Sequence, residues 1–101
     1  MKLVLSEEAM RCIERERAYL AHFSRRAAIA FSDQIKRAGR LIQQHPRVGT
    51  SVAPVEGVRR FVSAPYHVDY VIQPGRILIV SVMHSRQGPA DLDDSPDQDF
   101  E

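Results

Sequence analysis

The sequence predicts an α+β fold: an N-terminal strand, a helical hairpin, and a three-stranded antiparallel meander, all contributing to one sheet. Two observations carry this prediction. Between Ser6 and Pro46 the apolar residues recur every three or four positions, as in helices, whereas from Gly57 to His84 they recur every second position, as in strands. Two helices in a row followed by consecutive strands are typical of α+β domains, since α/β folds alternate the two.

The meander is the clearest part of the pattern. Tyr66, Val68, Tyr70 and Ile72 alternate with His67, Asp69 and Val71, so Tyr66 and Tyr70 are expected to share a face, as part of the core or of the sheet platform rather than as ligand contacts. Pro74-Gly75 then supplies the fixed φ and the positive φ of a type II turn. In the last strand Leu78, Val80 and Val82 alternate with Ile77, Ile79 and Ser81. Because both faces are largely apolar, this strand is predicted to be central in the sheet.

The N-terminal half begins with a short strand, Lys2–Leu5. Ser6 is a suitable N-cap for a first helix, whose first turn carries Glu7 and Glu8 at its positive end. The apolar stripe of this helix is imperfect and consists of Ala9, Ile13, Leu20 and Phe23.

Ser24 is the predicted N-cap of a second helix, which must end before Pro46. Its stripe consists of Ala28, Phe31, Ile35, Ala38 and Ile42. A loop is predicted from Pro46 to Gly57. We expect the two helices to cover one face of the sheet.

Charge divides the chain into two parts. Residues 1–86 carry all 14 Lys and Arg and 7 of the acids, a net charge of +7, and form the predicted folded domain. Residues 87–101 carry the other 6 acids and no base, a net charge of −6, and are expected to be a disordered tail. A tail that folds back on the basic body is the alternative. The basic body favours an anionic or acidic partner.

The cysteine content and the lack of long apolar runs indicate a cytoplasmic protein. Cys12 is the single cysteine, so no internal disulfide can form. Neither a signal peptide nor an apolar run long enough to cross a membrane is evident. The sequence also contains no motif that calls for a cofactor, and none is expected.

In order and spacing, several segments from Leu5 to Arg86 resemble the ParE branch of the RelE/ParE toxin superfamily, the plasmid-stabilisation toxins of bacterial toxin–antitoxin pairs. These segments are LSEEA, RRAAIAF, HPRVG, GVRR, PYHVDY and ILIVSVMHSR. The resemblance implies the toxin fold, a cognate ParD-like antitoxin, and a hetero-oligomeric complex with it. Neither a membrane nor sequence-specific nucleic acid binding is expected.

The superfamily hosts two mechanisms on one fold. ParE-like members inhibit DNA gyrase, which implies a toxin that is not an enzyme, whereas RelE-like members are endoribonucleases that cut messenger RNA on the ribosome. RNA cleavage needs a general acid or base and charge stabilisation, which His84 together with Arg59, Arg60 and Arg86 could supply. The RelE-like pattern also has a late tyrosine and nearby lysines, and this chain's only lysines are Lys2 and Lys36. Gyrase inhibition is therefore the leading hypothesis, and ribosome-dependent cleavage is the alternative.

Candidate site residues follow from this interpretation. Four residues are predicted to bind the target: Arg59, Arg60, His84 and Arg86. Three arginines that interrupt the stripe of the first helix are predicted to bind the antitoxin: Arg11, Arg15 and Arg17. No catalytic residue and no metal ligand is assigned. A metal site formed by His67, Asp69 and His84 is a weaker alternative, because the spacing is not diagnostic.

Overall fold

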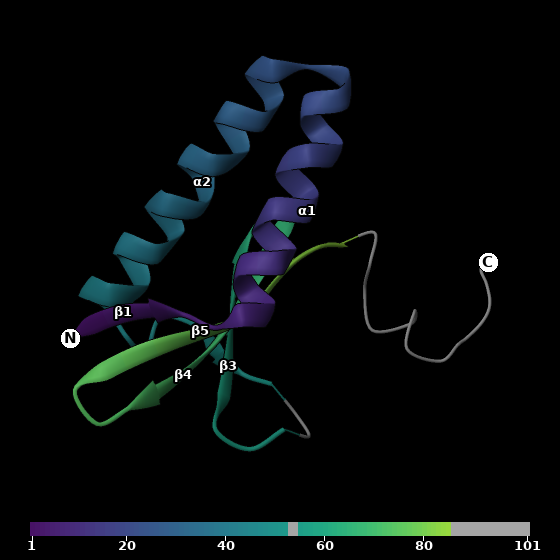
Figure 1. The fold of residues 1–101 in the computed structure, drawn as a ribbon. Helices are drawn as coiled ribbons and strands as arrows, with labels where there is room; N and C mark the ends of the chain where they lie inside the picture. Colours follow the sequence, from purple (N-terminus) through teal and green to yellow (C-terminus); the bar gives the residue numbers. More distant parts are fainter. Residues whose placement is uncertain (53–54, 86–101) are drawn as a thin grey trace.

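A computed structural model of the chain describes residues 1–52 and 55–85. Its sheet has five strands in the order β1-β5-β4-β3-β2, and two helices pack on it (Figure 1). The strands are β1 (Lys2–Leu5), β2 (Thr50–Ser51), β3 (Val58–Ser63), β4 (Tyr66–Gln73) and β5 (Arg76–His84). Only β1 and β5 pair in parallel, and the other pairs are antiparallel. The predicted α+β fold and the three-stranded meander are confirmed.

Strand β5, an interior strand between β1 and β4, contains a bulge that the sequence did not reveal. Asp69 pairs with Ser81 and the next residue, Tyr70, pairs with Ile79, so Val80 is an extra residue in β5. The bulge shifts the face of the strand by one position. The core therefore contains Ile77, Ile79 and Val82, and the regular alternation predicted from the sequence is wrong beyond Val80.

The β4–β5 hairpin turns as predicted. Gly75 has a φ of 73°, a region that other residues rarely adopt. Tyr66 and Tyr70 lie on the same face of β4 and are both buried, with Tyr70 fully so at 0% exposure. The expectation that they share a face is confirmed, and of the two placements left open, core or platform, the structure shows the core.

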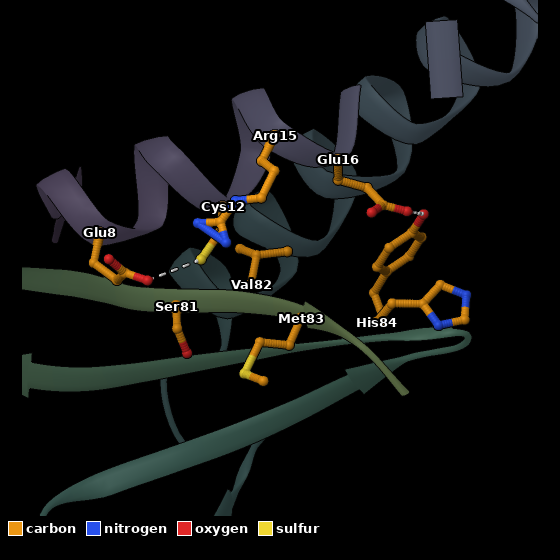
Figure 2. Close-up of a pocket in the computed structure, with 9 residues that line it drawn as sticks. Glu8, Cys12, Arg15, Glu16, Ser81, Val82, Met83 and His84 are labelled. Atoms are coloured by element: carbon orange, nitrogen blue, oxygen red, sulfur yellow. Dashed lines mark hydrogen bonds between the residues drawn. The ribbon is translucent and has the colours of Figure 1, made fainter. Parts of the chain in front are cut away.

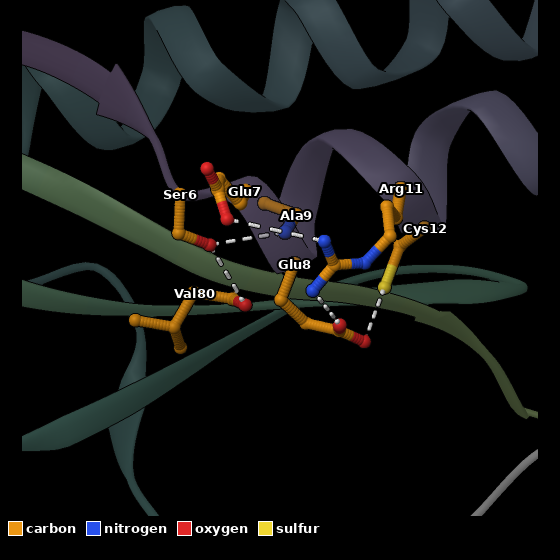
Figure 3. A network of polar contacts seen from close by, with 7 residues as sticks. All are labelled: Ser6, Glu7, Glu8, Ala9, Arg11, Cys12 and Val80. Atoms are coloured by element: carbon orange, nitrogen blue, oxygen red, sulfur yellow. Dashed lines mark hydrogen bonds and ion pairs between the residues drawn. The ribbon is translucent and has the colours of Figure 1, made fainter.

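Helix α1 (Glu7–Phe23) begins at the predicted cap, where the Ala9 backbone N–H donates to Ser6 Oγ at 3.0 Å. Ser6 also donates to the Val80 carbonyl at 3.2 Å, which ties the start of the helix to the bulge in β5 (Figure 3). Ala9 is buried, but Phe23 is 69% exposed. Phe23 belongs to the apolar stripe but not to the core, because it lies at the end of α1, where the turn between the helices lies away from the strands (Figure 1).

Helix α2 (Arg25–Gln44) begins at Ser24 and ends before Pro46, as predicted. Its inward face is also as predicted: Ala28, Phe31, Ala38 and Ile42 are buried and Ile35 is partly buried. Gly39 belongs to the same face, because a Cβ there would lie 3.0 Å from the Leu3 side chain of β1.

The segment from Pro46 to Gly57 is not loop throughout. Thr50 and Ser51 form β2, which pairs with Arg60 and Arg59 of β3. Two residues carry too little periodicity for a strand to be predicted.

The expected disorder of residues 87–101 concerns a part of the chain outside the described residues. Within residues 1–52 and 55–85, neither helix is long and apolar enough to cross a membrane.

Candidate functional site

Arg59 holds the loop that follows α2. Its Nε donates to the Gly49 carbonyl at 3.0 Å and its Nη2 to the Arg47 carbonyl at 3.2 Å. The same loop is bonded to the core, because Tyr70 Oη donates to the Pro46 carbonyl and accepts from the Gly49 backbone N–H. Arg59 therefore stabilises the loop, and its guanidinium is committed to backbone carbonyls.

Arg60 points to the other face of β3 and forms a two-point ion pair with Asp69 of β4. Nε donates to Oδ1 at 2.8 Å and Nη2 donates to Oδ2 at 2.9 Å. This fork geometry fixes the plane of the guanidinium. The bond to Asp69 also raises the pKa of Arg60 above its ordinary value, so that the group is charged at any physiological pH.

His67 lies beside this ion pair on β4 and is only 8% exposed. Its Nε2 is buried and has no hydrogen-bond partner within the described residues. Burial lowers the pKa of His67 below its ordinary 6.5, the charge of Arg60 lowers it further, and Asp69 opposes them. In the native protein His67 is therefore neutral at pH 7.

The depressed pKa of His67 predicts that the protein loses stability in mild acid. Below pH 6.5 the unfolded chain protonates this histidine while the native protein resists it, so the free energy of unfolding falls as the pH drops through this range. Chemical denaturation between about pH 7.5 and about pH 5.5 should show that His67→Gln loses less stability than the unmodified chain. The matched variant at the exposed His22, His22→Gln, should retain the full loss. Equal pH dependence in all three proteins would contradict the assignment.

His84 lies on the opposite face of the sheet from His67, at the side of α1. Its ring packs edge-on against Tyr66 with the ring centroids 5.1 Å apart. Tyr66 Oη in turn donates to Glu16 Oε2 of α1 at 2.6 Å, in a buried position (Figure 2). These three side chains line a small cavity of about 110 Å³ between α1 and β5.

Among the described residues, no strand pairs with the edge of β5 at this cavity. Strand β1 pairs with β5 only from Arg76 to Ile79. Beyond the bulge, within the described residues, α1 rather than a strand lies beside the segment from Ser81 to His84, and Glu8, Cys12 and Arg15 line the gap (Figure 2). An unpaired strand edge offers backbone groups to an incoming extended segment.

The three arginines of α1 do not form one row. Arg11 is bonded to Glu8 at 3.1 Å and lies within 4.0 Å of Glu7, on the exposed side of the helix start (Figure 3). Arg15 lines the cavity at β5. Arg17 instead lies at a second, larger groove.

This groove runs between the helical hairpin and the β1–β5 side of the sheet and has a volume of about 500 Å³. Its wall is mainly apolar, and three basic side chains lie along it: Arg17, Lys36 and Arg40. Apolar residues that line it include Leu3, Leu5, Ile13, Ile35, Val68 and Ile79. An acidic amphipathic segment complements such a surface in both hydrophobicity and charge.

The comparisons with known proteins agree with this architecture. The sequence model of the family described as "ParE toxin of type II toxin-antitoxin system, parDE" matches residues 3–89. The chain belongs to the ParE toxin family. Its fold is similar to that of a solved protein from P. aeruginosa, titled "Chromosomal ParDE TA system", with a TM-score of 0.70 and 18% sequence identity over 83% of this chain and 95% of that chain. No curated protein matches the chain.

In this ParE-family toxin the predicted target-binding residues do not converge on one spot. Arg59 faces the loop, Arg60 faces the far side of the sheet, and His84 faces α1, while Arg86 lies outside the described residues. His67 and His84 lie on opposite faces, and no three His, Cys, Asp or Glu among residues 1–52 and 55–85 are placed to hold a metal ion. The weaker metal interpretation therefore has no support.

The sequence assigned no role to Glu16, and it considered His67 and Asp69 only as ligands of the weaker metal alternative, not as partners of Arg60. Asp69 could have been paired with Arg60 from the strand pattern, because both lie at polar positions of adjacent strands. No sequence signal joins Glu16 to Tyr66, which lies 50 residues later.

Proposed function

We propose that this ParE-family toxin inhibits DNA gyrase by protein–protein contact and that a ParD-like antitoxin neutralises it. The observation that carries the proposal is the separation of His84 from Arg59 and Arg60. A ribonuclease needs an acid or base and charge-stabilising groups around a single phosphate. In this toxin Arg59 is bonded to backbone carbonyls and Arg60 to Asp69 on the opposite face from His84, which favours a binding surface over a catalytic centre.

Two assays performed side by side test the target. Purified toxin is added to gyrase in a supercoiling assay and to translating ribosomes in a messenger RNA cleavage assay. Loss of supercoiling with intact messenger RNA is expected, and cells that express the toxin should accumulate double-strand DNA breaks. Ribosome-dependent cleavage with unaffected gyrase would contradict the gyrase proposal.

The antitoxin is proposed to lie along the helical hairpin and the open edge of β5. The apolar groove with its basic rim suits an acidic amphipathic segment, and the unpaired edge beside Arg15 suits an extended one. A short neighbouring gene with a ribbon-helix-helix start and an amphipathic C-terminal half would encode such a partner. Co-expression of that gene should relieve toxicity and give a stable complex.

Charge reversal on α1 tests where the antitoxin binds. We expect Arg15→Glu to weaken the complex by about tenfold or more, because it places an acid in the cavity beside β5 where acidic partner residues are expected. Arg76→Glu is the matched control, since Arg76 is exposed at the other end of β5 and bonds only to Gln73 among the described residues. Binding measured by calorimetry should be unchanged in the control. Equal losses of affinity in both variants would indicate a long-range charge effect. Unchanged affinity in Arg15→Glu would show that the antitoxin binds elsewhere.

A further inference from the structure

A third cavity lies on the face of the sheet that the helices do not cover. Its volume is about 330 Å³, and Arg60, Val62, Pro65, His67 and Ser85 contribute to its lining. The strand register places Val62 directly opposite His67 and Arg60 opposite Asp69, so these four side chains share one face. Phe61 and Val68, which alternate with them, face the core on the helical side.

Arg60 lines this cavity, and part of its guanidinium has no hydrogen-bond partner among the described residues. Asp69 accepts hydrogen bonds from the Nε and Nη2 edge of the guanidinium and thereby fixes its orientation. The guanidinium has five N–H donors in a rigid fork, and the described residues provide no further acceptor for its Nη1 end. The side chain is 27% exposed, so this end can reach a ligand in the cavity.

His67 provides the second, independent observation. It is a buried polar side chain that lines the cavity, and its Nε2 has no partner among the described residues. Native proteins rarely leave a buried polar atom unsatisfied, so an atom of this kind at a cavity points to a group bound there. The charged groups that face His67 are Arg60 from β3 and Asp69 from its own strand, while β5 places Met83, which does not titrate, opposite it.

We propose that this cavity binds one carboxylate side chain of a partner protein, with Arg60 and His67 as hydrogen-bond donors and Asp69 as the residue that positions Arg60. The inference rests on the proposed function in that it takes the target to be a protein. The proposal specifies a carboxylate as the chemical group that one of the toxin's contact sites recognises on its target.

A carboxylate fits the site better than a phosphate. Asp69 already offsets the charge of Arg60, so a dianion would meet a carboxylate as well as a guanidinium. None of the described residues that line the cavity is a lysine, and its wall includes Val62, which is 66% exposed, together with Ala64 and Pro65. Such a wall favours an acidic side chain that carries apolar neighbours, as protein surfaces present and nucleic acid backbones do not.

The first experiment measures ligand binding without gyrase. The His67 ring is followed by NMR in the full-length toxin during titration with sodium butyrate, and separately with sodium phosphate and sodium chloride at equal ionic strength. Butyrate should shift the His67 signals saturably and raise the pKa of His67, because a bound anion favours the imidazolium. Arg60→Gln should weaken butyrate binding by about tenfold or more. Absence of saturation, or phosphate binding as tight as butyrate binding, would overturn the proposal, and the latter would favour an RNA phosphate.

The second experiment places a competing carboxylate in the site. Val62 is exposed and opposite His67, so Val62→Glu can occupy the cavity from within the chain without disturbing the core. Val62→Glu should reduce gyrase inhibition by about tenfold or more relative to the neutral, nearly isosteric Val62→Gln, and should raise the pKa of His67. Equal inhibition by the two variants would overturn the role of the cavity in target binding. If the unmodified toxin does not inhibit gyrase, the proposed function fails while the butyrate result stands.

The chain's own acidic residues are a second source of carboxylates, since the sequence continues from Ser85 into a segment containing Asp91, Asp93 and Asp94. Neutralising all three to asparagine in the full-length chain separates the sources. Unchanged butyrate affinity supports a partner's carboxylate. Butyrate binding that appears only in the neutralised variant would assign the cavity to the chain's own C-terminal residues and overturn the proposal.

Discussion

Replacing Arg86 with alanine is expected to abolish growth arrest, whereas replacing His84 with alanine should leave most of it. If the toxin acts by binding gyrase, Arg86 is a charged contact residue, and truncating one partner of a buried charge pair costs about 2–5 kcal/mol in binding. This corresponds to a loss of about 30-fold or more in affinity. No proton has to move in such a mechanism, so His84→Ala should have the smaller effect.

The opposite pattern is expected of a ribonuclease. There His84→Ala should remove RNA cleavage while ribosome binding survives, because a general acid or base contributes about 10²–10⁴-fold in rate. His84→Phe is the matched control, since it keeps a ring against Tyr66 and removes both titratable nitrogens. Toxicity that survives in His84→Phe agrees with gyrase binding. Ribosome-dependent cleavage that disappears in both His84 variants would contradict it.

Of the substitutions proposed for this protein, Tyr70→Phe is expected to lower the free energy of unfolding the most. Tyr70 is fully buried, and its hydroxyl donates to the Pro46 carbonyl at 2.6 Å and accepts from the Gly49 N–H at 3.0 Å. Without the hydroxyl both backbone groups lose their partner, which should cost about 2–4 kcal/mol. For a chain of this length the melting temperature should fall by on the order of 10–20 °C.

Two further variants test this explanation. Tyr19→Phe removes a hydroxyl from a tyrosine that is 51% exposed, where water can solvate any group that loses its partner, so the melting temperature should fall much less than in Tyr70→Phe. Gly49→Ala should destabilise the same region by a different route, because its Cβ would lie 2.9 Å from both the Arg60 carbonyl and Tyr70 Oη. A melting temperature unchanged in Tyr70→Phe would show that water or a shifted loop replaces the hydroxyl.

Local signals in the sequence determined most of the secondary structure. Ser6 and Ser24 cap the two helices because a side-chain oxygen accepts from a backbone N–H three residues later, an interaction contained within one turn. Gly75 has the positive φ that its turn requires, and Pro46 ends α2 through its own steric restriction. The buried stripe of α2 follows from helical periodicity alone.

The candidate sites depended on tertiary structure, because their partners are far apart in sequence. Arg59 and Arg60 are neighbours in one strand. The strand register places Arg60 beside Asp69, whereas the loop after α2 brings the carbonyls of Arg47 and Gly49 to Arg59. Arg15 and Arg17 are two residues apart on one helix, and they reach different cavities because about 200° of helical rotation separates them.

The bulge at Val80 is another feature that depends on tertiary structure, because it decides which residues of β5 face the core. The apolar residues on both faces of β5 indicated an interior strand, and β5 does lie between β1 and β4, although β4 is the middle strand. Which of them face the core was decided by the pairing of Tyr70 with Ile79 and of Asp69 with Ser81. A bulge is a property of two paired strands, so the sequence of one strand does not reveal it.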